Sequence, residues 1–132
     1  MATQVGWVDR TGHKTLKSTA AITQYSVVKV GGSGQCTACG VGEAGIGVAL
    51  TAATASLEYI DVKLWSAAGT FPGITASAVA AGAVLYTAAA GAINDATTTA
   101  SGGILGIALT AGASTAGGDV IEYTLPGPIA TT

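Results

Sequence analysis

Two cysteines three residues apart, Cys36 and Cys39, form the pattern with the clearest chemical potential. This spacing is that of redox motifs, in which the first thiol lies at a helix N-terminus after a strand and its pKa falls. Here Gly34 and Gly40 flank the pair in a turn-rich stretch. A structural zinc site needs four ligands, and the chain offers one histidine beside the two cysteines. We therefore expect two small hydrophobic thiols in a hairpin, with neither a metal nor a cofactor.

No other residue set has the spacing of a catalytic site. The only imidazole, His13, lies in an N-terminal segment without a rigid scaffold for a catalytic base. The turn at residues 31–34 lacks the lysine and the helix of a phosphate loop. The acids of the body are scattered, without the aromatic platform and long loops of a glycosidase cleft: Glu43, Glu58, Asp61, Asp95, Asp119 and Glu122. We expect no catalytic residue, and a compact hydrolase is the competing hypothesis from the enzyme class.

The elements that would position any site follow an internal duplication. Residues 47–52 return almost unchanged as residues 106–111, an offset of 59. Upstream, residues 22–30 align with residues 79–87 at an offset of 57, so a two-residue insertion separates the matched blocks. The pattern predicts one β domain over residues 21–132 with two related halves, at about 22–65 and 79–125.

Alternation of apolar and polar residues predicts strands rather than helices. In residues 57–65, Ile60, Val62 and Leu64 share one face, and Tyr59, Asp61, Lys63 and Trp65 share the other. Residues 119–125 alternate in the same way before prolines 126 and 128 end the ladder. Further strands are expected at residues 27–30, 46–50 and 83–87, and at most a short helical turn at 75–81.

Composition indicates a component of an assembly. Of 132 residues, 9% are charged and 49% are hydrophobic, with a net charge of -2, which does little to keep copies apart. Residues 1–20 carry a local charge of +2, far fewer positive charges than a nucleic-acid-binding surface needs to neutralise several phosphates. The apolar run at residues 76–93 is too rich in Ala and Gly for a membrane span, and residues 1–10 lack a secretory signal. We expect no nucleic-acid or membrane partner and assembly in the cytoplasm.

The first twenty residues differ from the rest and predict an extended arm. Trp7 is flanked by Val5 and Val8 in an otherwise polar segment that also contains Arg10. Such a segment can add a strand to the sheet edge of a neighbour. Alternatively, Trp7 folds back onto its own core, because tryptophan is usually well buried.

Several stretches carry a resemblance to a known family. The strand "Gly-x-x-Leu-Tyr" at residues 82–86, the segment "Ile-Leu-Gly-Ile-Ala-Leu" at 104–109 and the last strand at 119–125 are the most specific. Over about residues 21–126, this order resembles the capsid cement, or head decoration, proteins of tailed bacteriophages.

The resemblance implies a non-enzymatic virion protein that binds the exterior of an expanded capsid and stabilises the shell. Its expected partners are the major capsid protein and further copies of itself, as a homotrimer. The expected fold is all-β, a small, mostly antiparallel β-barrel or sandwich of β-tulip-like form with at most one short helix. The arm candidates for capsid contact are Val5, Trp7, Val8 and Arg10. The alternative is another virion or surface module, such as a tail, fibre or adhesin-like domain that binds a receptor or glycan.

Overall fold

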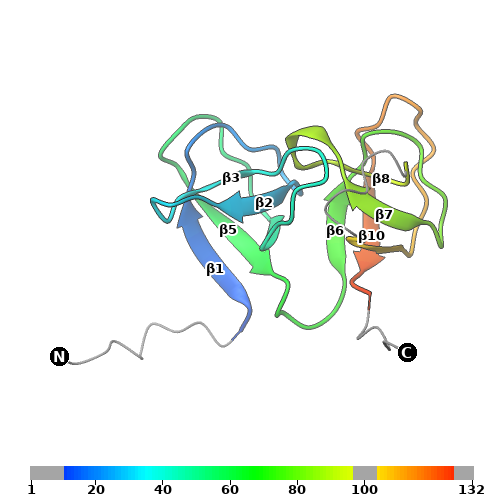
Figure 1. The fold of residues 1–132 in the computed structure, drawn as a ribbon, viewed down its shortest axis with the longest axis horizontal. Coiled ribbons are helices and arrows are strands. Elements are labelled where there is room, and N and C mark those ends of the chain that lie inside the picture. The colour runs from blue at the N-terminus through cyan, green and yellow to red at the C-terminus, as the bar shows by residue number, and fades with distance from the viewer. Residues whose placement is uncertain (1–10, 97–103, 127–132) are drawn as a thin grey trace.

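The protein is an all-β structure of two antiparallel five-stranded sheets, as the sequence predicts (Figure 1). The computed structural model describes residues 11–96 and 104–126. The two sheets lie side by side, the N-terminal half forming one and the C-terminal half forming the other.

Each sheet is built from five consecutive strands. The first contains β1 (His13–Lys17), β2 (Val27–Val30), β3 (Cys36–Ala38), β4 (Gly47–Ala49) and β5 (Tyr59–Leu64), in the order β1-β5-β4-β2-β3. The second contains β6 (Phe71–Ile74), β7 (Val84–Thr87), β8 (Ile93–Asn94), β9 (Gly106–Ala108) and β10 (Val120–Thr124), in the order β6-β10-β9-β7-β8. The strand order of the first half is therefore repeated in the second.

Backbone hydrogen bonds repeat along with the strand order. Ile22 N–H donates to the Ala53 carbonyl at 2.8 Å, and Val79 N–H donates to the Gly112 carbonyl at 2.8 Å. These pairs are related by the offsets of 57 and 59 that the sequence shows. The duplication in sequence thus corresponds to a duplication of topology and register.

The structure adds a third offset that the sequence comparison did not reveal. Leu50 N–H donates to the Asp61 carbonyl at 2.7 Å, and Leu109 N–H donates to the Glu122 carbonyl at 2.8 Å. Asp61 and Glu122 are 61 residues apart, so a second two-residue insertion precedes β10. The last strands of the two halves, β5 and β10, correspond only when this insertion is counted.

Elements that the sequence did not predict lie mostly at the sheet edges. β1 falls inside the expected arm of residues 1–20 and pairs with β5. β6 contains Pro72, which a strand tolerates only where its missing N–H is not needed, and β6 is an edge strand. The sequence allows at most a short helical turn at residues 75–81, and the structure has none there, because Thr75 bridges Ile93. A 3₁₀ turn, η1 (Ala89–Gly91), lies between β7 and β8.

One core joins the two sheets. The predicted alternation is confirmed, since Ile60 and Val62 on one face of β5, and Ile121 and Tyr123 on one face of β10, are all at most 2% exposed. A hydrophobic cluster combines side chains of both halves: Val27, Cys39, Val48, Phe71, Val79, Leu85, Ile93, Ala108, Ile121 and Tyr123. Backbone bonds also cross between the halves, because Gly91 N–H donates to the Cys39 carbonyl at 2.7 Å.

The apolar run at residues 76–93 takes part in this core rather than in a helix. It passes through β7, whose Leu85 is fully buried, and through η1 to Ile93. In the described ranges, 11–96 and 104–126, the structure has no helix with the length and hydropathy needed to cross a bilayer.

Candidate interaction surface

The residues predicted for capsid contact, Val5, Trp7, Val8 and Arg10, lie outside the described residues. The division into an arm of residues 1–20 and a body of residues 21–132 therefore stays a prediction at its N-terminal end. Within the expected arm, His13 belongs to β1 and is exposed, opposite Lys63 on β5. The chain thus enters the first sheet directly after the predicted contact residues.

The two cysteines are structural. Cys36 and Cys39 are free thiols, 0% and 1% exposed, and their side chains belong to the two separate hydrophobic clusters. Burial raises the pKa of Cys36, and it raises the pKa of Cys39 from 9.0 to about 11. Among the described residues, no three His, Cys, Asp or Glu side chains are grouped closely enough to hold a metal ion. Their surroundings suit small apolar side chains rather than reactive thiolates.

We expect Cys39 to resist thiol reagents in the folded protein. A pKa of about 11 gives a thiolate fraction at pH 8 about a hundredfold below that of a thiol at 9.0. Because the unfolded chain ionises this thiol first, stability is full below pH 9 and falls as the pH rises toward 11. A thiol-specific disulfide reagent should label Cys39 of the native protein only as fast as the folded structure opens and exposes the thiol. Labelling of both thiols at the rate of free cysteine would contradict this.

Five carboxylates of the described residues accept hydrogen bonds from neighbouring polar groups. Glu43 accepts hydrogen bonds from Lys29 Nζ at 2.6 Å and from the Gly40 N–H, and these bonds lower its pKa. Asp61 accepts a hydrogen bond from Thr15 Oγ1 at 3.2 Å. Others fix loops in the same way, at Glu58 with Thr54, Asp119 with Ser114 and Glu122 with Thr70. Three of these acids accept a backbone N–H and the other two accept a threonine hydroxyl, which differs from the paired geometry of a glycosidase.

Two surface hollows lack the convergent polar groups of a catalytic pocket. One, of about 250 Å³, lies between the halves and is lined in part by Glu43, Trp65 and Leu125. The other, of about 400 Å³, lies on the second sheet beside Pro72 and Glu122. Each is lined by one carboxylate and by no histidine, cysteine or lysine. Such hollows suit contact with a partner surface better than chemistry on a small substrate.

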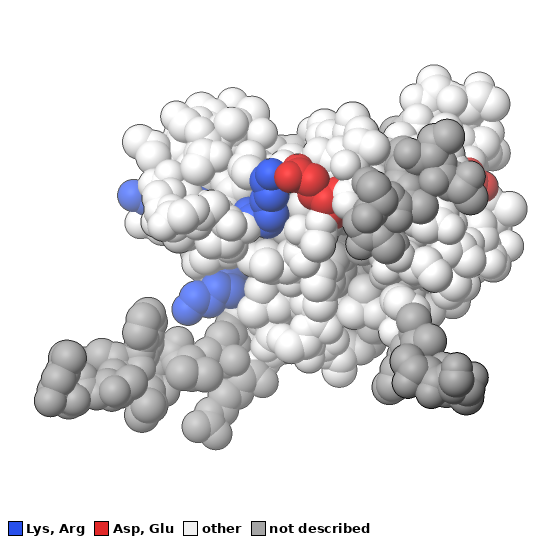
Figure 2. Space-filling view, in the orientation of Figure 1, with Lys and Arg blue, Asp and Glu red and all other residues white. Residues whose placement is uncertain are grey.

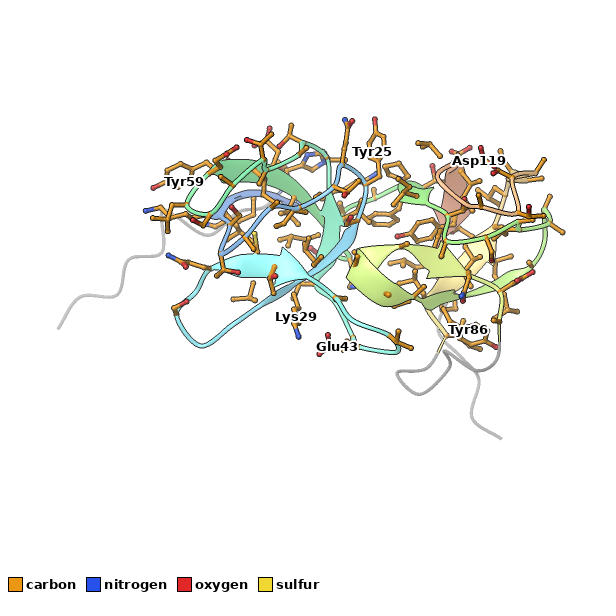
Figure 3. The ribbon with its side chains drawn as sticks, turned by 90° about the horizontal axis from the view of Figure 1, so that it is seen from above. Tyr25, Lys29, Glu43, Tyr59, Tyr86 and Asp119 are labelled. Carbon is orange, nitrogen blue, oxygen red and sulfur yellow. The ribbon has the colours of Figure 1, made fainter. Side chains whose placement is uncertain are left out.

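Exposed apolar and basic groups gather instead on the outer side of β1 and β5. Tyr59 is 68% exposed and Leu57 is 61% exposed. Lys17 Nζ lies 5.3 Å from the centre of the Tyr59 ring, a cation–π contact. Figure 3 places Tyr59, Tyr25 and Asp119 along one side of the molecule and Lys29, Glu43 and Tyr86 along the opposite side. We call the surface formed by His13, Thr15, Lys17, Leu57 and Tyr59 the β1 surface.

The positive charges lie on one half of the molecule. The described lysines, Lys14, Lys17, Lys29 and Lys63, all precede residue 70, and residues 71–132 contain three acids and no lysine or arginine. In Figure 2 the blue side chains accordingly lie on the half of the molecule that the first sheet forms. The two halves share a fold but present different electrostatic surfaces, so the difference is not a requirement of folding.

Comparison with known proteins identifies the fold. No family model matches the sequence, and no curated protein matches it. Among solved structures, the N base of the head fibre gp8.5 of bacteriophage phi29 matches with a TM-score of 0.68. The match covers 86% of this chain and 92% of that chain at 13% sequence identity. This chain therefore has the fold of a bacteriophage head-fibre base.

Proposed function

We propose that this chain is a structural virion protein that binds the exterior of a bacteriophage capsid and stabilises the shell. The observation that carries the proposal is the match in fold to a head-fibre base, which covers 86% of the chain. It agrees with the sequence resemblance to capsid cement proteins, which was drawn from different features. The proposed partners are the major capsid protein and further copies of this chain, as a homotrimer, and the proposed role is not enzymatic.

The physical properties of the body support this role. Two sheets share one core, so the body is a rigid unit that can transmit load between contacts. Many copies on a capsid lattice need only modest contacts each, because avidity multiplies them. A surface with few charges and several exposed apolar side chains, among them Leu57, Tyr59, Ile104 and Val120, suits such contacts.

A second candidate is the base module of a fibre attached to the phage head. The matching fold favours it, since the phage phi29 protein is itself the N base of a head fibre. Both candidate functions require attachment to the phage head. They differ in whether the attached protein carries a further component or acts on the shell itself. A fibre base should join a longer distal protein or domain, whereas a cement protein should raise the stability of the shell by itself.

Removing residues 2–10 is expected to abolish attachment and leave the body folded. This deletion spares β1, whose Leu16 packs against a buried cluster and whose neighbour Ser18 N–H donates to the Glu58 carbonyl at 2.8 Å. A deletion through residue 18 would remove an edge strand and confuse folding with binding. The measurement is co-sedimentation with expanded capsids that lack the protein, with the mass in free solution from light scattering.

The matched control is full-length protein with Trp7→Ala, which keeps the length and charge of the arm. It should bind more weakly than wild type and more strongly than the deletion variant. Undiminished attachment of the deletion variant would refute the arm as the contact. Failure of the full-length protein to bind any capsid form would refute the capsid-binding proposal and make a glycan screen the next step.

A further inference from the structure

The register of β1 leaves a backbone donor and acceptor on its outer edge. Gly12 accepts from Leu64 N–H at 2.7 Å and Ser18 donates to the Glu58 carbonyl at 2.8 Å, so even-numbered residues bond to β5. In an antiparallel ladder the alternate residues point the other way, which directs the N–H and C=O of Thr15 away from the sheet. The same edge is closed further along, because Ser18 forms a parallel bridge with Cys36 of β3 and Thr19 N–H donates to the Cys36 carbonyl at 2.9 Å. Within the described ranges, no strand pairs with this side of Thr15 itself.

The equivalent edge in the second half is closed by proline. Pro72 lies opposite Glu122 as Thr15 lies opposite Asp61, and it is 57 residues beyond Thr15. Thr75 N–H donates to the Asp119 carbonyl at 2.8 Å, so odd-numbered residues of β6 bond inward and Pro72 points outward. Its ring removes the donor at the position where Thr15 keeps one. The fold therefore tolerates the loss of the outward N–H at this position of the edge strand. In the first half, Thr15 keeps that N–H.

The side chains around this open edge indicate the chemistry of a partner. Lys17 and His13 lie on the outer row of β1, with Lys63 on the next strand. Tyr59, 68% exposed, lies directly opposite Lys17. Two β1 strands paired antiparallel about Thr15 would place Lys17 of each copy opposite His13 of the other, with no acidic partner for either lysine. A strand that carries acidic side chains would instead place an opposite charge beside Lys17.

We propose that the edge of β1 at Thr15, ahead of the bridge between Ser18 and Cys36, accepts an extended strand of the protein to which this chain attaches. The incoming strand pairs with the backbone of Thr15, places an acidic side chain beside Lys17 and an apolar one against Tyr59. This inference rests on the proposed function, because it adds to the contact of the N-terminal arm a second contact with the capsid partner, at a defined sheet edge. Strand addition gives affinity through main-chain bonds and specificity through alternate side chains.

The test compares Thr15→Pro with Thr15→Ala. Both variants lose the Thr15 hydroxyl bond to Asp61, but only proline removes the outward N–H. Proline fits the site because Pro72 occupies the equivalent position of β6, and the inward ladder to β5 stays intact. We expect Thr15→Pro to weaken binding to expanded capsids by about tenfold or more, whereas Thr15→Ala binds as wild type. In the wild-type complex, the Thr15 amide should become protected from hydrogen exchange.

The outcomes separate this inference from the function on which it rests. Equal binding of wild type, Thr15→Ala and Thr15→Pro would overturn the strand-addition site while leaving capsid attachment in place. A wild-type dimer that Thr15→Pro converts to a monomer would make a second copy the occupant and also overturn the proposal. If wild type binds no capsid, a capped peptide of alternating valine and glutamate is the probe. Shifts of the Thr15 amide with wild type but not Thr15→Pro support the site, and their absence overturns it.

Discussion

Replacing Gly47 or Gly106 with alanine is expected to lower the free energy of unfolding by about 3 kcal/mol or more. A Cβ at Gly106 would lie 2.5 Å from the Thr124 carbonyl oxygen and 2.9 Å from Tyr123 Cδ2. A Cβ at Gly47 would overlap the Lys63 carbonyl oxygen in the same way. The obstacle is the backbone of the neighbouring strand in each half, which a change of rotamer cannot move. The glycine that opens both copies of the repeated segment is therefore required by strand packing.

The matched control is Gly32→Ala. Gly32 lies in a turn, does not have a positive φ, and has no atom within 4 Å of the position that a Cβ would take. Alanine there should leave stability unchanged or raise it by up to about 1 kcal/mol, because it restricts the unfolded chain. Urea unfolding followed by circular dichroism measures all three variants. Midpoints for Gly47→Ala and Gly106→Ala that match the midpoint for Gly32→Ala would show that the strands can separate enough to admit a methyl group.

The sequence predicts the buried strands well because their side chains alternate. In β5 and β10 the buried residues are apolar, and most of the residues between them are polar or charged, with Tyr59 and Val120 as the exposed exceptions. The repeated segment predicts β4 and β9 because the same packing constraint selects the same residues twice. What the sequence resolves is the part of the fold in which a strand has one face in a core.

The edge strands were missed for a physical reason. β1 reads His-Lys-Thr-Leu-Lys, with Leu16 as its one apolar residue, because a strand at an edge packs less of itself against the core. β6 contains Pro72 and β8 has two residues, so neither has the pattern of a central strand. The third offset was hidden because Leu57, at φ 65, corresponds to Gly118, at φ 86. Two different residue types occupy the same left-handed turn, and sequence comparison does not align them.

The unpaired outer side of β1 at Thr15 also could not be predicted from the sequence, because it depends on the register of the sheet. Thr15 and Pro72 have no similarity as residue types, and only their positions opposite Asp61 and Glu122 relate them. The predicted contact residues Val5, Trp7, Val8 and Arg10 were selected by composition, and they precede this edge in the chain. Composition could indicate that the N-terminal region makes contacts. Which backbone groups of β1 are available to a partner depends on which alternate residues bond to β5, and only the structure shows this.

Trp65→Ala is expected to destabilise the protein by about 3–5 kcal/mol. The sequence placed Trp65 on the outer face of a strand through residue 65, but β5 ends at Leu64 and the indole turns toward the second sheet. Its ring centre lies 5.1 Å from that of Phe71 and 6.5 Å from that of Tyr123 in edge-on contacts. The indole N–H donates to the Gly45 carbonyl at 2.8 Å. Trp65 therefore holds aromatic residues of the second half against the first.

The comparison of Trp65→Ala with two further variants separates its contributions. Trp65→Phe keeps an aromatic ring against Phe71 but loses the bond to Gly45, so it should recover part of the lost stability. Tyr59→Ala removes an aromatic side chain that is 68% exposed, so we expect a change within about 0.5 kcal/mol. Urea unfolding monitored by circular dichroism gives the three values. A loss for Trp65→Ala no larger than for Tyr59→Ala would mean that the remaining shared core holds the two sheets together without the indole.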